Sequence, residues 1–124
     1  LDSVVYAFSV SDKFGDSGVT GLCIVTNIIK GESIVIDSLL MSCRIIGRNI
    51  EYAFMDYVIR KMKEKKLSVI KAKYIKTNKN EQVKNFYDKC SFDLIDENKS
   101  TRNYILDTSS YKPRKLNYIE VISE

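Results

Sequence analysis

The segment from Arg44 to Asn49, Arg-Ile-Ile-Gly-Arg-Asn, has the residue types of an anion-binding turn. It follows an apolar run typical of a buried strand and precedes a stretch with helical periodicity. At such a junction the first backbone N–H groups of the helix have no partner within it, and the helix dipole favours a bound anion. Gly47 lets the backbone approach a ligand, and Asn49 tolerates an unusual φ. The segment therefore suits a pyrophosphate, although many α/β proteins turn from strand to helix through a glycine without binding one.

Two side chains near this turn could do acid–base or covalent chemistry. Asp37 lies in the middle of an apolar strand, where a lone carboxylate is costly unless it is paired or protonated. We interpret it as a general base or as the group that orients an acyl acceptor; the alternative is a buried carboxylate bonded to a neighbouring strand or loop. Cys43 precedes Arg44, and a thiolate stabilised there could hold an acyl group covalently. A cysteine at a strand end is otherwise a small buried hydrophobe.

The composition limits the chemistry further. The chain has 124 residues, 44% of them hydrophobic and 29% charged, which indicates one globular domain over residues 1–124. It contains no histidine, which excludes Ser-His-Asp and Cys-His catalysis and most zinc sites, so we expect no metal. Its three cysteines form no C-x-x-C pair, which favours a reducing compartment such as the cytoplasm. We expect no signal peptide or membrane span, and because the first residue is Leu1 we expect a piece of a larger protein.

The formal net charge is +4, and positive charge concentrates in the basic run Arg60–Lys66 and again at Lys112, Arg114 and Lys115. Such a run is typical of a solvated helix face. The alternative is a surface for an acidic partner, such as a nucleotide phosphate or an acyl carrier protein. Aromatic residues are not interleaved with the run as a base-stacking surface requires, so we expect no nucleic-acid partner.

The elements that must position these residues follow from the apolar periodicity. Helical spacing predicts one amphipathic helix from Arg48 to Lys66 and a shorter helix around Val83, Phe86 and Cys90. A polar, glycine-containing stretch at 12–18 suits a hairpin connection. Runs rich in β-branched and aromatic residues predict six strands, at 4–10, 19–29, 34–43, 68–75, 92–95 and 103–106. Strands that alternate with helices after an initial meander predict a mixed α/β sheet.

Two motifs resemble those of a known family. Arg44-x-x-Gly47-x-Asn49 resembles the R/Q-x-x-G-x-G/A signature by which GNAT acyltransferases hold the pyrophosphate of coenzyme A. Asn49 departs from this signature, because the family usually has glycine there.

The second motif follows at the expected distance. Asn80-x-x-x-x-x-Phe86-Tyr87-x-x-x-Ser91-Phe92 resembles the family's N-x-x-x-x-x-(F/L)-Y-x-x-x-G-F segment, in which a helix lines the thioester end of the cleft. Ser91 replaces the usual glycine at a position after the helix that prefers a left-handed backbone, which should cost roughly 1 kcal/mol of stability.

The resemblance implies a fold, a ligand and a set of contacts. It implies a mixed, mostly antiparallel sheet with flanking helices that binds an acyl thioester of coenzyme A or of carrier-protein phosphopantetheine. Strand 34–43 should be central and should diverge from strand 68–75, because a pantetheine arm needs backbone groups left free between two parallel strands. Tyr87 would protonate the leaving thiolate, as a tyrosine at this point often does in the family. The implied ligand contacts are Met41, Arg44, Ile46, Gly47, Arg48, Asn49 and Asn80.

A narrower resemblance covers most of the chain. Residues 10–18, 36–48 and 77–80 look like the C-terminal domain of FkbH-like proteins, which join a HAD-type phosphatase region to a GNAT-like region. Those proteins are associated with glyceryl-carrier-protein thioesters of polyketide-type pathways. The resemblance implies a HAD-like domain before Leu1 and a GNAT-like domain that lacks its first strand and helices here. Our leading hypothesis is an acyltransferase domain, and the alternative is a non-catalytic module that docks an acyl carrier protein beside the phosphatase domain.

Overall fold

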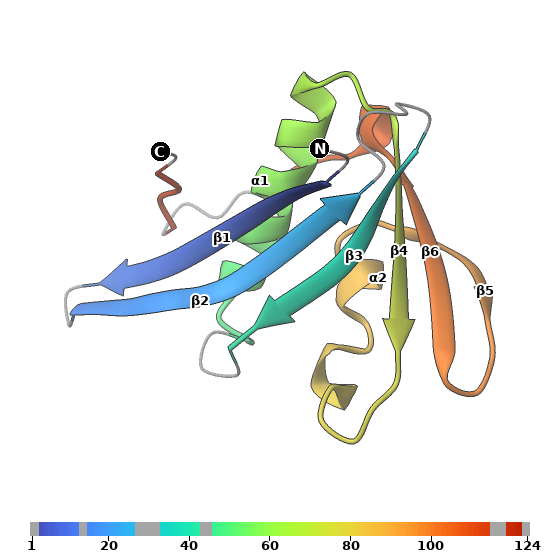
Figure 1. Cartoon of the computed structure of the whole chain (residues 1–124), viewed down its shortest axis with the longest axis horizontal. Helices are drawn as coiled ribbons and strands as arrows, with labels where there is room; N and C mark the ends of the chain where they lie inside the picture. Colours follow the sequence, from blue (N-terminus) through green and yellow to red (C-terminus); the bar gives the residue numbers. More distant parts are fainter. Residues whose placement is uncertain (1–2, 13–14, 27–32, 43–45, 115–118, 123–124) are drawn as a thin grey trace.

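A computed structural model describes residues 3–12, 15–26, 33–42, 46–114 and 119–122 of the chain. These residues form one six-stranded sheet in the order β1-β2-β3-β4-β6-β5 (Figure 1). One pair of neighbours, β3 and β4, is parallel and the others are antiparallel, so the predicted mixed, mostly antiparallel α/β sheet is confirmed. The strands are β1 (Ser3–Asp12), β2 (Gly15–Thr26), β3 (Ile34–Met41), β4 (Val69–Ile75), β5 (Asp93–Glu97) and β6 (Thr101–Asp107). The helices are α1 (Ile50–Glu64), α2 (Phe86–Lys89) and the 3₁₀ helices η1 (Glu81–Val83) and η2 (Thr108–Ser110).

The hairpin of β1 and β2 is longer than the sequence predicted. Pairing continues to Asp12 and Gly15, so the polar stretch 12–18 contributes to both strands instead of forming an open connection. Gly15 and Gly18 have φ angles of 128° and 69°, which only glycine adopts readily. The glycines thus allow this irregular end of the hairpin, where the register between the strands also shifts.

Strand β3 contains a bulge at Asp37. Ser38 pairs with Ile24 and Ile36 pairs with Val25, which leaves Asp37 without a partner of its own on the described strand β2. One extra residue reverses which side chains face the core. Before the bulge the even-numbered side chains of β3 are buried, and after it the odd-numbered ones, Leu39 and Met41, pack against the core.

The two parallel strands separate at this bulge. Over their described lengths β3 and β4 pair at Ile34↔Ile70 and Val35↔Lys71 and nowhere else. Figure 1 shows the two strands converging at one end and spreading apart toward the other. The predicted divergence of a central third strand from the next strand is therefore confirmed.

Helix α1 packs on one face of the sheet, as its periodicity predicted. Its buried side chains include Met55, Ile59 and Met62, each 0% exposed, and they join the core with residues from β2, β3, β4 and β6. A left-handed residue, Lys66 at φ 61°, follows the end of the helix, and the N–H of Leu67 donates to the carbonyl of Met62 at 3.0 Å. This arrangement satisfies the last carbonyls of the helix.

The second predicted helix is shorter than expected. The chain forms the 3₁₀ turn η1 and then the single α turn α2, where the sequence predicted one helix. Asn85 is the residue before α2, with φ −104° and ψ 13°. Asparagine favours caps and turns over helix interiors, which explains the interruption. Phe86, Tyr87 and Cys90 are nevertheless buried, as the helical pattern predicted.

Ser91 adopts the left-handed backbone that the sequence predicted, with φ 70°. We expect Ser91→Gly to raise the free energy of unfolding by about 1 kcal/mol, because glycine adopts this conformation without strain. Chemical denaturation monitored by circular dichroism measures the change. Ser68→Gly is the control, since Ser68 is exposed and is not among the described residues with positive φ, so no gain is expected there. An unchanged or lower stability of Ser91→Gly would contradict the prediction.

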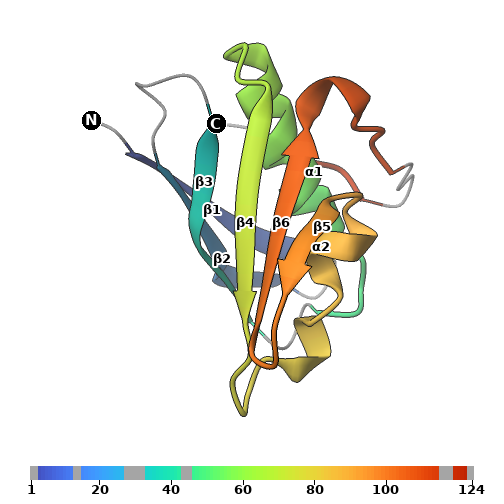
Figure 2. The same cartoon turned by 90° about the vertical axis from the view of Figure 1, so that its right-hand side faces the viewer.

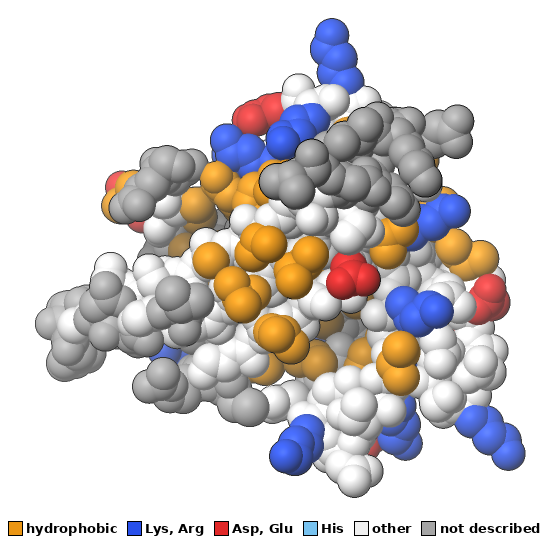
Figure 3. Space-filling model, viewed as in Figure 1, with side chains coloured by type: hydrophobic (Ala, Val, Ile, Leu, Met, Phe, Trp, Pro, Cys, Tyr) orange, Lys and Arg blue, Asp and Glu red, His pale blue; other side chains and the backbone are white. Residues whose placement is uncertain are grey.

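Both helices cover the same face, and the other face of the sheet has apolar side chains at its surface. Figure 2 shows α1 behind β4 and β6. On the face opposite the helices, hydrophobic side chains gather over the strands in the space-filling view (Figure 3). Val5, Leu40 and Ile75 are 58%, 62% and 56% exposed.

Candidate functional site

A cleft opens where β3 and β4 separate. Its volume is about 370 Å³, and both strands and the segment 77–87 line it. The bulge makes the cleft, because it turns the second half of β3 away from β4 and leaves the two strands without shared hydrogen bonds there. Five of the residues predicted from the sequence line this one cleft: Asp37, Met41, Ile46, Asn80 and Tyr87.

Asp37 lies at the cleft but is not buried. Its side chain is exposed, and the hydroxyl of Ser38 donates to its Oδ2 at 3.3 Å. The expectation of a desolvated carboxylate was wrong, because the side chains of Ile34 and Ile36 face the core and the alternation of the strand places Asp37 on the opposite face. The carboxylate can still accept a proton from a molecule in the cleft, which it lines together with Leu39 and Leu40.

Tyr87 reaches the cleft from a cluster of aromatic rings. It is 7% exposed, and its ring centroid lies 5.2 to 5.6 Å from those of Phe86, Phe92 and Tyr104. Burial raises the pKa of its hydroxyl above the ordinary value, so the group is protonated at neutral pH. Tyr87 lines the cleft, and its hydroxyl makes no hydrogen bond with the described part of the chain, so a ligand that reaches the hydroxyl could accept its proton in a hydrogen bond.

Asn80 shapes the end of the cleft. Its Oδ1 accepts hydrogen bonds from the backbone N–H of Thr77 at 2.8 Å and the hydroxyl of Tyr74 at 3.0 Å, and its Nδ2 donates to the carbonyl of Ile75 at 2.7 Å. These bonds tie the end of β4 to η1. The side chain therefore holds the loop, and its direct contact with a ligand stays a prediction.

The turn before α1 contains two residues with positive φ, one of which is Asn49, the residue expected to tolerate an unusual φ. Gly47 has φ 91° and Asn49, the N-cap of α1, has φ 67°, so both lie in the left-handed region. A Cβ at Gly47 would have no atom of the described residues within 4 Å, so that side of the turn is open toward them. Arg48 is exposed, while Arg44 and Cys43 lie outside the described residues.

Glu51 is the site residue that the sequence analysis missed. It is 3% exposed, and its Oε2 accepts a hydrogen bond from the N–H of Gly47 at 2.7 Å. Its Oε1 is also buried and has no hydrogen-bond partner among the described residues. An acidic residue in the first turn of a helix is common, because it complements the helix dipole, so no local pattern indicated that this one is buried.

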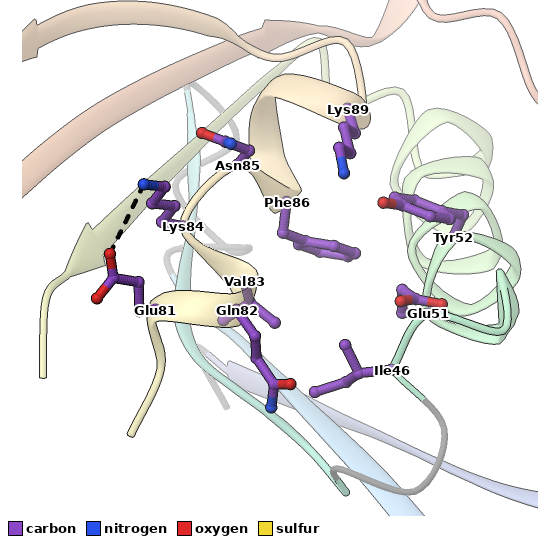
Figure 4. Close-up of a pocket in the computed structure, with 10 residues that line it drawn as sticks. All are labelled: Ile46, Glu51, Tyr52, Glu81, Gln82, Val83, Lys84, Asn85, Phe86 and Lys89. Carbon is purple, nitrogen blue, oxygen red and sulfur yellow. Dashed lines mark ion pairs between the residues drawn. The ribbon is translucent and has the colours of Figure 1, made fainter. Parts of the chain in front are cut away.

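Glu51 lines a second, smaller pocket of about 160 Å³ next to the cleft (Figure 4). In the close-up, Glu51 and Tyr52 project from α1 on one side, and Val83 and Phe86 face them from the other. Ile46 lines both the cleft and this pocket, so the two spaces adjoin at the turn.

The two described cysteines are part of the core. Cys23 and Cys90 are 0% and 5% exposed, and burial raises the pKa of each thiol to about 12. We therefore expect brief iodoacetamide treatment at neutral pH to modify Cys43 alone, since a thiolate at the turn would react while the core thiols stay protonated and enclosed. Mass spectrometry of the digested chain identifies the modified residue. Prior incubation with an acyl thioester should protect Cys43, and an unreactive Cys43 would remove the covalent role.

Among the described residues there is no group of three or more Cys, Asp or Glu side chains that could hold a metal ion. Within the same part of the chain, no helix has the length and the apolar character needed to cross a membrane.

Comparisons with known proteins identify the fold. Neither protein-family models nor curated protein sequences match the chain. Solved structures do match. A protein described as a GNAT-family acetyltransferase from Desulfovibrio desulfuricans has a TM-score of 0.68 at 11% identity, covering 86% of this chain and 69% of its own. PaiA N-acetyltransferase from Thermoplasma acidophilum, in complex with coenzyme A, has a TM-score of 0.68 at 17% identity, covering 86% and 62%.

A third match is the N-acetyltransferase PseH from Campylobacter jejuni in complex with acetyl coenzyme A. Its TM-score is 0.56 at 21% identity, and the match covers 72% of this chain and 60% of that one. These identities are too low to carry a function, but the shared architecture covers most of this chain. The strand order, the separated parallel pair and these matches together show that the chain has the fold of the GNAT acetyltransferases.

Proposed function

We propose that this chain is an acyltransferase domain that binds an acyl thioester of coenzyme A or of carrier-protein phosphopantetheine and transfers the acyl group. The observation that carries the proposal is the cleft between β3 and β4, because two parallel strands that stop pairing leave backbone donors and acceptors free. A pantetheine arm has two amides and can pair with such a strand edge as an extended peptide does. The fold shared with proteins solved in complex with coenzyme A supports this ligand.

The side chains at the cleft can supply the acid and the base of a direct transfer. Asp37 would accept the proton of the acceptor's amine or hydroxyl as that group attacks the thioester carbonyl. A carbon–nitrogen or carbon–oxygen bond forms, the carbon–sulfur bond breaks, and Tyr87 gives its proton to the departing sulfur. If Cys43 takes part, its thiolate attacks the carbonyl first, and the acceptor then releases the acyl group from it.

The finer assignments rest on the FkbH-like segments of the sequence. We propose that the acyl group is glyceryl, that a HAD-type phosphatase domain precedes this domain in the same polypeptide, and that the donor is held by an acidic carrier protein of a polyketide-type pathway in the cytoplasm. Predicted contacts with the thioester arm remain Met41, Arg44, Ile46, Gly47, Arg48, Asn49 and Asn80.

The alternative is a docking module without catalysis. Lys73 and Lys79 are exposed and line the cleft, which gives its mouth a positive charge that an acidic carrier protein would complement. Such a module would bind the carrier protein through its surface and would not act on the thioester.

Release of free thiol separates the two functions. We expect the chain to bind acetyl-pantetheine or acetyl coenzyme A and to release thiol in the presence of an amine or hydroxyl acceptor, measured with a thiol-reactive dye. Binding of a carrier protein without any binding or turnover of thioesters would favour the docking module and reject the transferase.

A further inference from the structure

The carboxylate of Glu51 occupies the place where the turn before α1 would bind an anion. The N–H of Gly47 is one of the backbone donors that the sequence assigned to a pyrophosphate. In the structure this N–H donates to Glu51 Oε2 at 2.7 Å, a short charge-assisted hydrogen bond. The protein therefore supplies an anion of its own at the turn.

The position of Glu51 makes this charge effective at short range. The residue is 3% exposed, so little water screens the carboxylate. Its Oε1 is buried without a hydrogen-bond partner in the described part of the chain, so half of the carboxylate is not neutralised by a donor. A second anion placed at the open side of Gly47 would meet this charge at close range, and like charges in a poorly solvated site repel strongly.

The described residues around the adjoining pocket supply no excess positive charge. Two acidic and two basic side chains line it: Glu51, Glu81, Lys84 and Lys89. Glu81 and Lys84 pair with each other at 3.7 Å, as Figure 4 shows. Among the described lining residues, Lys89 is then the one cation outside an ion pair, and its charge is balanced by that of Glu51. The described lining therefore has no net charge, whereas binding of a pyrophosphate would be favoured by an excess of positive charge.

We propose that Glu51 sets the specificity of the donor site by disfavouring a pyrophosphate at the turn. The site then prefers a pantetheine thioester without that group over the corresponding coenzyme A thioester. This inference rests on the proposed function, since it concerns which thioester enters the same cleft. Glu51 is a specificity residue in this account, because it acts on the phosphate end of the donor and not on the reacting atoms.

Glu51→Gln tests the proposal with little change in shape. The amide oxygen of Gln can still accept from the N–H of Gly47, while the amide nitrogen replaces the unpartnered oxygen with a donor that a phosphate can use. We expect affinity for acetyl coenzyme A to rise at least tenfold and affinity for acetyl-pantetheine to change less than twofold, as measured by NMR titration. Glu81→Gln is the matched control, because it removes a negative charge from the same pocket at an exposed position, and it should leave the ratio of the two affinities within twofold.

The affinities of the unmodified chain for the two thioesters give a second test, which does not depend on any variant. It should bind acetyl-pantetheine at least as tightly as acetyl coenzyme A. A clear preference for acetyl coenzyme A, or the same affinity ratio in Glu51→Gln as in the unmodified chain, would overturn the role of Glu51 and leave the proposed transferase intact. If the unmodified chain binds neither thioester, the proposed function fails and this inference fails with it.

Discussion

Replacing Tyr87 with Phe should lower turnover by about 100-fold while the protein stays as stable as before. The loss in rate follows from removing a positioned proton donor, which contributes roughly 10² to 10⁴-fold in catalysis. Stability should be preserved because the hydroxyl has no hydrogen-bond partner among the described residues, and the ring keeps its contacts with Phe86, Phe92 and Tyr104. Steady-state release of thiol gives the turnover, and thermal melting gives the stability.

Tyr104→Phe is the matched control for this substitution. Tyr104 is a buried tyrosine of the same cluster, but its hydroxyl donates to Asp88 Oδ2 at 2.8 Å and the residue does not line the cleft. Loss of the Tyr104 hydroxyl should lower the melting temperature and leave the turnover of the folded protein unchanged. If Tyr104→Phe slowed turnover as much as Tyr87→Phe, the aromatic cluster and not the proton donor would be responsible.

The pH dependence gives an independent check on Tyr87. The residue acts in its protonated form, and burial raises the pKa of its hydroxyl above the ordinary 10.0. The active form therefore persists as the pH rises to that value, and Tyr87 should cause no alkaline loss of rate below pH 10. A loss of rate in that range that is present in the unmodified protein and absent from Tyr87→Phe would contradict this assignment.

Asp37→Asn should also lower turnover by about 100-fold, since the amide cannot accept the proton of the acceptor. The effect should appear in kcat for every acceptor, because the carboxylate acts during the chemical step. A variant with an unchanged kcat and a raised KM for the acceptor would show that Asp37 only orients the acceptor. Kinetics over a range of acceptor concentrations distinguish these two roles.

Asp93→Asn controls for the loss of a surface carboxylate. Asp93 is exposed on the strand β5 and does not line the cleft. We expect the turnover of the Asp93→Asn variant to equal that of the unmodified chain. Because Asp37 is exposed as well, neither substitution should change the melting temperature by much, and a slow but fully folded Asp37→Asn variant is the expected result.

Much of the fold could be predicted because its elements have strong local signals. The helical spacing of apolar residues located α1, and Asn49, which the sequence analysis expected to tolerate an unusual φ, adopts a left-handed backbone before it. The aromatic pattern around Phe86 and Tyr87 predicted burial even though the helix there is only one turn long. The matching motif also predicted the left-handed Ser91.

Two features of the site could not be predicted, because they depend on tertiary structure. Apart from Asp37 and Ser38, the residues of β3 are apolar on both faces, so the sequence does not reveal which face the helices cover or that the alternation changes after Asp37. The sequence around Glu51 is typical of an ordinary acidic residue in the first turn of a helix. The burial of Glu51 depends on how the turn before α1 folds back onto that helix. Local sequence patterns indicate whether a segment prefers a helix or a strand, whereas the exposure of Asp37 and the burial of Glu51 depend on the segments packed around them.

Titration of the isotope-labelled chain with acetyl-pantetheine, followed by NMR, tests the claim that the cleft between β3 and β4 holds the thioester arm. Backbone amide signals of Leu39 and Met41 in β3 and of Tyr74 and Ile75 in β4 should shift with ligand concentration, because these strand edges line the cleft. Signals of β1 and β5, the outer strands of the described sheet, should stay unchanged. Saturable shifts confined to the cleft are the predicted result. No shifts at all, or shifts confined to the outer strands, would contradict the assignment of this cleft as the thioester site.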